Sequence, residues 1–274
     1  MTTFTPRTIE HGVDRVTAYD QGAHVAEWTR DGVPVVWVSE ESRYESGTAI
    51  RGGVPLVWPW FGNGPEGDLE PAHGLLRTAF WSLAKKWESG WVWTIDQEAT
   101  KSQPGIETFP YRYEAQLEVE VRDGLKIALT VRNTDEAPFS YEAALHTYLH
   151  VGDIRNISVS GLDGVHYFDK VLETNQTQQG PLPVSQETDR IYQSAADVSV
   201  VDPDLGRTIN VSATEGSHTV VWNPWETKAR DMKDMGDDEW TQMVCIETAR
   251  LGDKKFTLSP GQSATMATTI SLQR

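Results

Sequence analysis

Short segments in which apolar and polar residues alternate recur along this chain, and they limit its possible folds more than any other feature. The clearest is LEVEVRDGLKIALTV, residues 117–131, where Asp123-Gly124 separates two alternating runs. This is the pattern of a β-hairpin with one face of each strand in a core and the other in water. Helical candidates are short, at Ser194–Asp197 and Lys228–Met235. We therefore predict an all-β fold of many strands and few short helices.

The chain has 274 residues, without a fixed-period repeat, a low-complexity tract or a composition shift typical of a linker. One domain over residues 1–274 is the simplest interpretation. No apolar run approaches the roughly 20 residues that a membrane-spanning helix needs, and the first residues lack the pattern of a signal peptide. We expect a cytoplasmic protein that does not enter a membrane, and we expect a monomer.

The charge and the cysteine content exclude several classes of partner. The formal net charge is -16 at pH 7, and its field would repel nucleic acids and anionic membranes. A single cysteine, Cys245, allows no intrachain disulfide and no thiolate-cluster metal site. The acidic run Asp231–Glu239 is expected to be a solvated loop, with a mobile lid as the alternative.

Residues 51–81 concentrate glycine, proline, tryptophan and arginine in one segment, RGGVPLVWPWFGNGPEGDLEPAHGLLRTAFW. Glycine and proline favour an irregular backbone, while aromatic faces suit a sugar ring and guanidinium groups bind phosphate oxygens in a fixed plane. The segment therefore indicates a surface for a phosphorylated carbohydrate, with paired arginines reversing the negative field locally. One or two of five tryptophans are expected at the ligand and the others in the core: Trp58, Trp60, Trp81, Trp222 and Trp225.

Two polar residues stand where strand alternation makes their direction informative. In AALHTYLHV, residues 143–151, His146 shares a face with Tyr148 and points away from the most apolar side. In QMVCIET, Glu247 shares a half-buried face with Cys245, where desolvation would raise its pKa towards values useful for proton transfer. From these residues alone, two interpretations remain open. His146 and Glu247 could form an acid/base pair, or His146 could be a core histidine and Glu247 a member of a buried salt bridge.

Six motifs follow one another along almost the whole chain: RGGVPLVWPWFG (51–62), AHGLLRTAFW (72–81), LHTYLHVGDI (145–154), TDRIY (188–192), WNPW (222–225) and MVCIETA (243–249). Their order resembles that of the aldose 1-epimerase superfamily, and most of all its glucose-6-phosphate 1-epimerase (hexose-6-phosphate mutarotase) branch. The resemblance implies a large galactose-mutarotase-like β-sandwich, or supersandwich, with a cleft on a concave sheet. It also implies interconversion of the α and β anomers of a hexose 6-phosphate, with glucose 6-phosphate as the expected substrate, without metal or cofactor.

The resemblance further implies the catalytic residues. His146 matches the general acid of the family and Glu247 its general base. The Glu247 carboxylate would remove the proton of the anomeric O1 hydroxyl while protonated His146 gives a proton to the ring oxygen. The ring would then open to the aldehyde and reclose as either anomer, and each group would contribute about 10² to 10⁴-fold.

Four further matches concern substrate binding. Asp189 of TDRIY matches a residue that holds sugar hydroxyls. Arg51 and Arg77 match two arginines that bind the phosphate, and His73 lies beside them in the site. Trp60 stands where several relatives carry glutamine, a change that would alter one polar contact to the sugar. The alternative for both arginines is surface salt bridging with nearby acidic residues: Glu66, Asp68 or Glu70.

Two other functions share parts of this pattern. A non-catalytic carbohydrate-binding module would have the same sandwich, aromatic residues and acidic charge, but it would not need His146 and Glu247 together. A glycoside hydrolase would need two carboxylates across the scissile bond. Asp189 and Glu247 could supply them, but His146 would then have no role.

Overall fold

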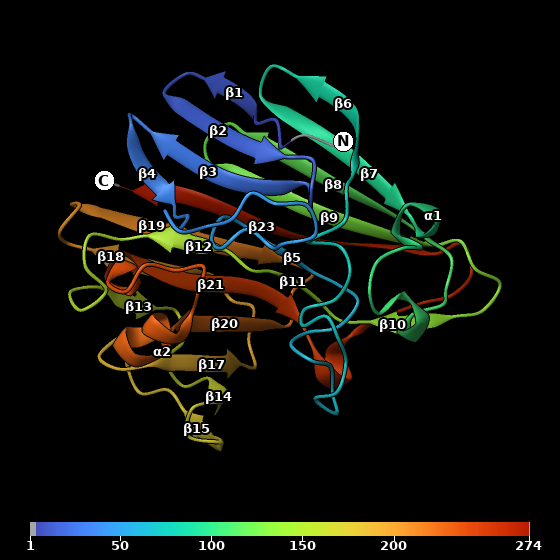
Figure 1. Cartoon of the computed structure of the whole chain (residues 1–274). Coiled ribbons are helices and arrows are strands. Elements are labelled where there is room, and N and C mark those ends of the chain that lie inside the picture. Colours follow the sequence, from blue (N-terminus) through green and yellow to red (C-terminus); the bar gives the residue numbers. More distant parts are fainter. Residues whose placement is uncertain (1–3, 274) are drawn as a thin grey trace.

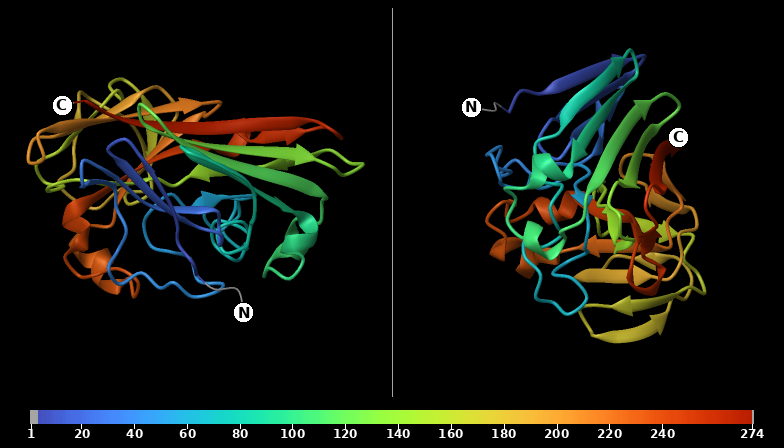
Figure 2. Two further views of the ribbon diagram at one scale, coloured as in Figure 1. Left: turned by 90° about the horizontal axis from the view of Figure 1, so that it is seen from above. Right: turned by 90° about the vertical axis from the view of Figure 1, so that its right-hand side faces the viewer.

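The computed structural model describes residues 4–273 and consists mainly of antiparallel strands in two large sheets (Figures 1 and 2). The first sheet has twelve strands. Along its main path they are β1 (Arg7–His11), β2 (Asp14–Tyr19), β3 (His24–Arg30), β4 (Val33–Val36), β12 (Tyr148–His150), β21 (Met243–Arg250), β20 (His218–Asn223), β17 (Thr188–Tyr192), β14 (His166–Asp169) and β15 (Thr174–Thr177). Two short strands join beside this path, β11 (Ala143–Leu145), which pairs with β21, and β5 (Leu56–Val57), which pairs with β11.

The second sheet has nine strands and packs against the first (Figure 2). In spatial order they are β16 (Leu182–Pro183), β13 (Ser158–Ser160), β18 (Val198–Asp202), β19 (Arg207–Thr214), β23 (Ser263–Gln273), β9 (Leu125–Asn133), β8 (Tyr113–Val121), β7 (Gly90–Asp96) and β6 (Ser82–Trp87). A separate small sheet pairs β10 (Phe139–Tyr141) with β22 (Phe256–Leu258). The predicted all-β sandwich is confirmed.

The hairpin that the alternation predicted is formed by β8 and β9. The two strands pair antiparallel, and Val121 lies opposite Leu125 on either side of the Asp123-Gly124 turn. Apolar side chains at alternate positions of both strands are buried. Alternation with a period of two therefore decides which face of this sheet enters the core.

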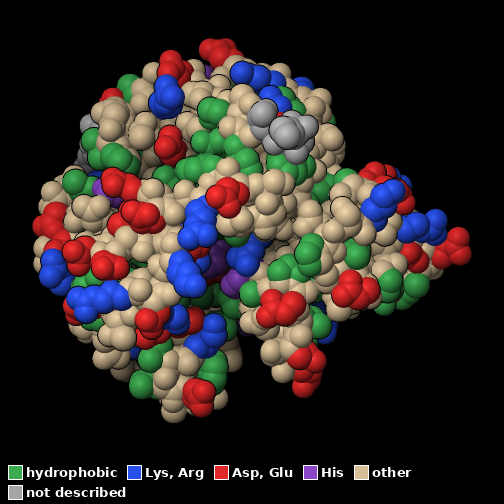
Figure 3. All heavy atoms as spheres, viewed as in Figure 1, with side chains coloured by type: hydrophobic (Ala, Val, Ile, Leu, Met, Phe, Trp, Pro, Cys, Tyr) green, Lys and Arg blue, Asp and Glu red, His purple; other side chains and the backbone are tan. Residues whose placement is uncertain are grey.

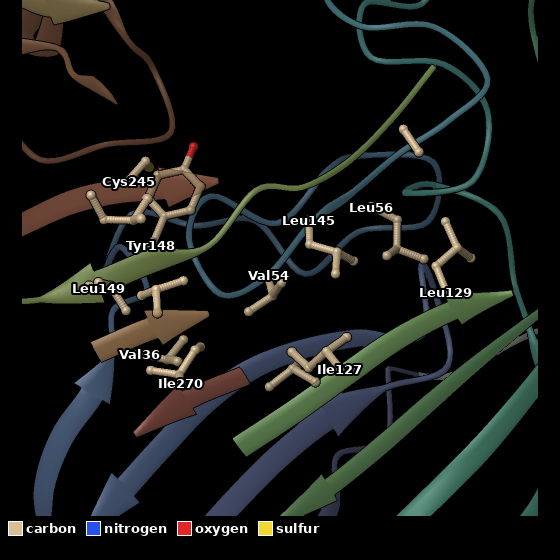
Figure 4. Close-up of a cluster of buried hydrophobic side chains, with 14 of the residues drawn as sticks. Val36, Val54, Leu56, Ile127, Leu129, Leu145, Tyr148, Leu149, Cys245 and Ile270 are labelled. Carbon is tan, nitrogen blue, oxygen red and sulfur yellow. The ribbon is translucent and has the colours of Figure 1, made fainter. Parts of the chain in front are cut away.

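The main core lies between the two sheets. Figure 4 shows Leu56 and Leu145 facing Ile127 and Leu129 of β9, and all four side chains are at most 2% exposed. Burying an aliphatic side chain of this size contributes about 1.5–3 kcal/mol. Since β11 and β12 turn their leucines towards this core, the opposite face of the twelve-stranded sheet is left for polar side chains. Tyr148 points to that opposite side in Figure 4.

The helices are short, as expected, but their positions differ in part from the prediction. The candidate at Lys228–Met235 corresponds to α2, which spans Trp225–Asp231. The helix predicted at Ser194–Asp197 is wrong, because the Ser194 hydroxyl accepts a hydrogen bond from the Ala196 amide and stabilises a turn instead. The remaining helical segments are α1 (Gln97–Thr100) and the 3₁₀ turns η1 (Ile106–Thr108), η2 (Glu239–Gln242) and η3 (Gly252–Lys254). Across residues 4–273, no helix has the length and apolar character needed to cross a membrane.

Candidate active site

A cavity of about 140 Å³ opens on the face of the twelve-stranded sheet that is opposite to the core. In Figure 3 this face is hollowed where histidine side chains lie, with lysine and arginine side chains around them. Five of the six predicted site residues line the cavity. A larger groove of about 510 Å³ runs over the nine-stranded sheet, but none of the six lines it. The smaller cavity is lined by Arg51, Phe61, His73, His146, Tyr148, Lys170, Asp189, Val220, Trp222 and Glu247.

The register of β11, β12 and β21 brings His146 and Glu247 together. Leu145 pairs with Thr248 before the gap between β11 and β12, and Tyr148 pairs with Cys245 after it. The same register carried across the gap sets His146 directly opposite Glu247. Residues about 100 positions apart in the sequence thus become cross-strand neighbours.

A second row of side chains crosses the same face two residues further along. Tyr148 pairs with Cys245, Cys245 with Trp222, and Trp222 with Asp189. Lys170 extends the row beyond the end of β14, since its amide donates a 2.8 Å hydrogen bond to the Asp189 carbonyl. Alternate positions on four neighbouring strands therefore present their side chains to one cavity.

The strand predicted through AALHTYLHV is interrupted at its centre. The His146 amide donates to the Pro55 carbonyl at 3.0 Å, and the Thr147 amide donates to the Leu145 carbonyl at 2.9 Å. The prediction of one continuous strand is therefore wrong, because a loop from residues 51–81 takes the place of a sheet partner here. The predicted alternation still holds, since His146 and Tyr148 both line the cavity.

His146 and Glu247 form a close, buried pair. His146 Nε2 lies 3.3 Å from Glu247 Oε1, and the Glu247 side chain is 2% exposed. Burial lowers the pKa of His146 well below its usual value, and the positive charge of nearby basic groups adds to the effect. Burial and the charge of Asp189 raise the pKa of Glu247 well above its usual value. Both shifts favour a pair that holds one proton, because losing that proton leaves a buried anion and gaining a second leaves a buried cation.

Both members of the pair also have unused hydrogen-bonding capacity. Nδ1 of His146 and Oε2 of Glu247 are buried without a hydrogen-bond partner among the described residues. An unsatisfied buried polar atom costs about 1–3 kcal/mol. Such atoms at the wall of a cavity are typical of groups that hydrogen-bond a ligand.

The two predicted arginines are close enough for their charges to interact, but only Arg51 lines the cavity, and Arg77 is the predicted site residue that does not. Arg51 donates from one terminal nitrogen to the Tyr148 hydroxyl at 3.0 Å and from the other to Asp234 Oδ2 at 3.1 Å. Arg77 donates to the Ala72 carbonyl at 2.6 Å. Burial lowers the pKa of Arg77, and the positive charge of Arg51 adds to this effect. The Nε atoms of both arginines are buried without a partner in the described part of the chain, so both guanidinium groups keep donors for an anion.

The backbone after Arg51 explains the two glycines of the RGG motif. Gly52 and Gly53 have φ angles of 112° and 69°, in the region that favours glycine. A Cβ atom would collide with the Cα of Val38 at Gly52, and with the carbonyl oxygen of Val25 at Gly53. Only glycine lets the loop pass this close to the sheet, and the loop in turn holds Arg51 at the cavity.

His73 is held beside the pair as a neutral hydrogen-bond donor. Its Nδ1 accepts a hydrogen bond from the Gly62 amide at 3.3 Å. Burial lowers its pKa to about 3, with the charges of Arg77 and other cations adding to the effect. A neutral ring whose Nδ1 accepts must carry its hydrogen on Nε2. The ring centroids of His73 and His146 are 5.8 Å apart.

The other end of the cavity has a lysine that the sequence analysis did not identify. Lys170 Nζ lies 3.0 Å from Asp189 Oδ2 and 5.8 Å from the centre of the Phe61 ring. Nothing in the local sequence distinguishes Lys170 from other lysines at strand ends. Tyr148 was also missed as a site residue, although its shared face with His146 was a usable signal.

Most of the tryptophans belong to the core. Trp58, Trp60 and Trp81 are buried away from the cavity, and Trp225 packs on Trp240. Trp222 lines the cavity. The Trp60 indole donates to the Pro71 carbonyl at 3.0 Å, so the residue that departs from the family pattern does not reach this cavity.

The acidic residues near the arginines are not those considered as alternatives. Arg51 pairs with Asp234, which belongs to the acidic run 231–239, and not with Glu66, Asp68 or Glu70. The expectation of a solvated loop for this run is right only in part. Asp237 and Asp238 are exposed, whereas Met235 is buried.

Comparisons with known proteins find similar sequences along most of the chain. The family model described as aldose 1-epimerase matches residues 7–271. An Escherichia coli K12 protein named "Putative glucose-6-phosphate 1-epimerase" is 36% identical over 245 residues, which cover 88% of this chain and 81% of that protein.

Solved structures share the fold of this chain. The crystal structure of a "putative mutarotase" from Salmonella typhimurium superimposes with a TM-score of 0.85 at 30% identity, covering 97% of this chain and 90% of that one. A galactose mutarotase-like protein from Lactobacillus casei has a TM-score of 0.77 at 18% identity, covering 98% of this chain and 100% of that one, and shows that the fold is shared.

Proposed function

This chain belongs to the aldose 1-epimerase family of isomerases, and we propose that it interconverts the α and β anomers of glucose 6-phosphate at the cavity of the twelve-stranded sheet. The observation that carries the proposal is the His146–Glu247 contact of 3.3 Å in a cavity that also reaches Arg51. Anomer exchange needs one proton donor and one proton acceptor near the anomeric carbon, and an anchor for the phosphate at the other end of the sugar.

The pair can supply both proton transfers because it holds one proton in total. Transfer of that proton from Glu247 to His146 across their contact generates a carboxylate base and an imidazolium acid. Glu247 then takes the proton of the O1 hydroxyl while His146 protonates the ring oxygen, and the C1–ring oxygen bond breaks to give the aldehyde. Both sugar oxygens are bonded to C1, so two adjacent groups can reach them. Rotation about C1–C2 and the reverse transfers give the other anomer, and the pair returns to its starting state.

Phosphate binding is assigned to Arg51 and Arg77. The positive charges of Arg51 and Arg77 repel each other, and an anion between the two guanidinium groups would relieve that repulsion. Each has a free Nε–H donor, and guanidinium–phosphate hydrogen bonds are strong because both partners are charged. His73 offers a further neutral donor to a sugar or phosphate oxygen.

Sugar binding is assigned to the opposite end of the cavity. Asp189 accepts hydrogen bonds from sugar hydroxyls and Lys170 donates to them, while the faces of Trp222 and Phe61 pack against the apolar side of the ring. This end has both donors and acceptors, as hydroxyl groups require.

Saturation-transfer NMR of glucose 6-phosphate tests the proposal. The wild-type protein is expected to exchange the two anomers well above the spontaneous rate, and Glu247→Gln to exchange them about 10² to 10⁴-fold more slowly because the proton acceptor is lost. Glu187→Gln is a matched control, since Glu187 pairs with Lys228 outside the cavity. Sugar binding with no enhanced exchange by the wild type would favour a carbohydrate-binding module, and release of reducing sugar from a glycoside would favour a hydrolase.

A further inference from the structure

We propose that Asp234 lowers the affinity of the cavity for phosphate, because its carboxylate holds a donor of the Arg51 guanidinium group until the phosphate of the substrate displaces it. This inference rests on the proposed function, in which Arg51 and Arg77 bind phosphate. It adds a residue that takes no part in the proton transfers and belongs to none of the six motifs.

The contact between Arg51 and Asp234 places a carboxylate where a phosphate would bind. Asp234 Oδ2 lies 3.1 Å from a terminal nitrogen of Arg51, while the other terminal nitrogen of Arg51 donates to Tyr148 at 3.0 Å. The two ionic side chains are similarly exposed, at 27% and 26%. A carboxylate and a phosphate use the same donors of a guanidinium group. A bound phosphate and the Asp234 carboxylate therefore cannot both use the same Arg51 nitrogen freely, and their like charges repel each other.

The rest of the acidic run holds the loop in place around Asp234. Met235 is buried, and the Glu239 carboxylate accepts hydrogen bonds from the Ser39 hydroxyl at 2.5 Å, the Glu40 amide at 2.8 Å and the Gly236 amide at 2.7 Å. With the backbone fixed on this side, rotation of the Asp234 side chain is the smallest movement that frees Arg51. The acidic run 231–239 therefore acts as a fixed support for the Asp234 carboxylate, which can leave Arg51. It does not act as the mobile lid that the sequence analysis gave as the alternative.

A phosphate that contacts both arginines is expected to gain more free energy than the loss of the Arg51–Asp234 ion pair costs. An ion pair that is partly open to water contributes little, so a phosphate that contacts Arg51 and Arg77 together can replace it. A small anion that lacks a sugar gains fewer contacts and competes less well with the resident carboxylate. Asp234 thus lowers the affinity for every phosphate by a similar factor, and a sugar phosphate, which gains further contacts, tolerates this loss better than inorganic phosphate does.

Calorimetric titration of the full chain with inorganic phosphate at pH 7.5 tests this inference. Asp234→Asn keeps the size of the side chain and removes its charge, and it is expected to lower the Kd for phosphate about three- to tenfold. Asp237→Asn makes the same change of charge at an exposed position of the same run, and it is expected to change the Kd less than twofold. A Kd for Asp234→Asn that equals that of Asp237→Asn, or is higher than the wild-type value, would overturn the role of Asp234.

A third variant separates this inference from the proposed function. Arg51→Ala is expected to abolish measurable phosphate binding. If Arg51→Ala binds phosphate as the wild type does, the phosphate site is wrong and the inference falls with it. If Arg51→Ala loses phosphate while Asp234→Asn gains nothing, the phosphate site stands and only the inference is wrong.

Discussion

At the scale of single residues, the protonation of the His146–Glu247 pair determines how the site can work. Burial shifts the pKa of each group towards its neutral form, downwards for His146 and upwards for Glu247. The usual values are 6.5 for histidine and 4.5 for glutamate. Both shifts favour the form of the pair in which Glu247 carries the single proton and His146 is neutral.

This order of titration predicts the pH profile of anomer exchange. The value of kcat/KM is expected to be level through neutral pH. It should fall at acidic pH well below 6.5, where the pair takes up a second proton on His146, and at alkaline pH, where Glu247 loses the shared proton. The measurement is kcat/KM for glucose 6-phosphate from pH 4.5 to 10, corrected for the ionisation of the substrate phosphate. Asp237→Asn serves as the control and is expected to show the wild-type profile. A rate that rises through pH 6.5 as one free histidine titrates would contradict the shared proton.

Single residues also mark the limit of prediction from the sequence. His146 and Tyr148 could be placed on one face because strand alternation has a period of two. Lys170 and Asp234 could not be predicted, since Lys170 reaches the cavity from a strand end and Asp234 reaches Arg51 from a loop between α2 and η2, where no periodic pattern applies. Their position depends on which elements become neighbours in space.

At the scale of elements, the loop from residues 51–81 and the interrupted strand β11–β12 form one unit. The Pro55 carbonyl of the loop accepts a hydrogen bond from the His146 amide, and its Gly53 carbonyl accepts one from the Tyr148 amide, both at 3.0 Å. The sequence predicted an irregular loop with two arginines and a strand with a histidine. It could not predict that one completes the hydrogen bonding of the other, because long-range pairing leaves no local signal.

The glycines of this loop give a prediction at the same scale. Gly52→Ala places a Cβ against the backbone of Val38, and we expect it to lower the free energy of unfolding by about 1–3 kcal/mol more than a control that bears only the backbone strain. Gly47→Ala is that control, since its φ is also positive, at 80°, but nothing lies within 4 Å of its added Cβ. Urea unfolding of both variants gives the comparison. An equal loss of unfolding free energy in both variants would show that the close approach to Val38 is not the reason for glycine at position 52.

At the scale of the whole molecule, a protein with a net charge of -16 has to bind a negatively charged substrate. The fold meets this requirement by placing Arg51 and Lys170 at one cavity, with Arg77 near Arg51, while burial raises the pKa of Glu247 and so favours the uncharged form of that carboxyl. Screening by salt limits the field of the other carboxylates to about 8–10 Å. The family resemblance predicted the two-sheet sandwich, but only the structure gives this local balance.

The central claim is that the cavity exchanges the anomers of a sugar that it holds by the phosphate. The most direct test is the NMR exchange rate of glucose 6-phosphate and of free glucose, for the wild type and for Arg51→Ala, with the exposed Arg43→Ala as the control. Losing one charged hydrogen-bonding anchor costs about 1.5–3 kcal/mol. We therefore expect kcat/KM for glucose 6-phosphate to fall about 10- to 100-fold in Arg51→Ala, with little change for glucose and none in Arg43→Ala. A wild type that exchanges glucose as efficiently as glucose 6-phosphate, with both rates unaffected by the loss of Arg51, would contradict the account.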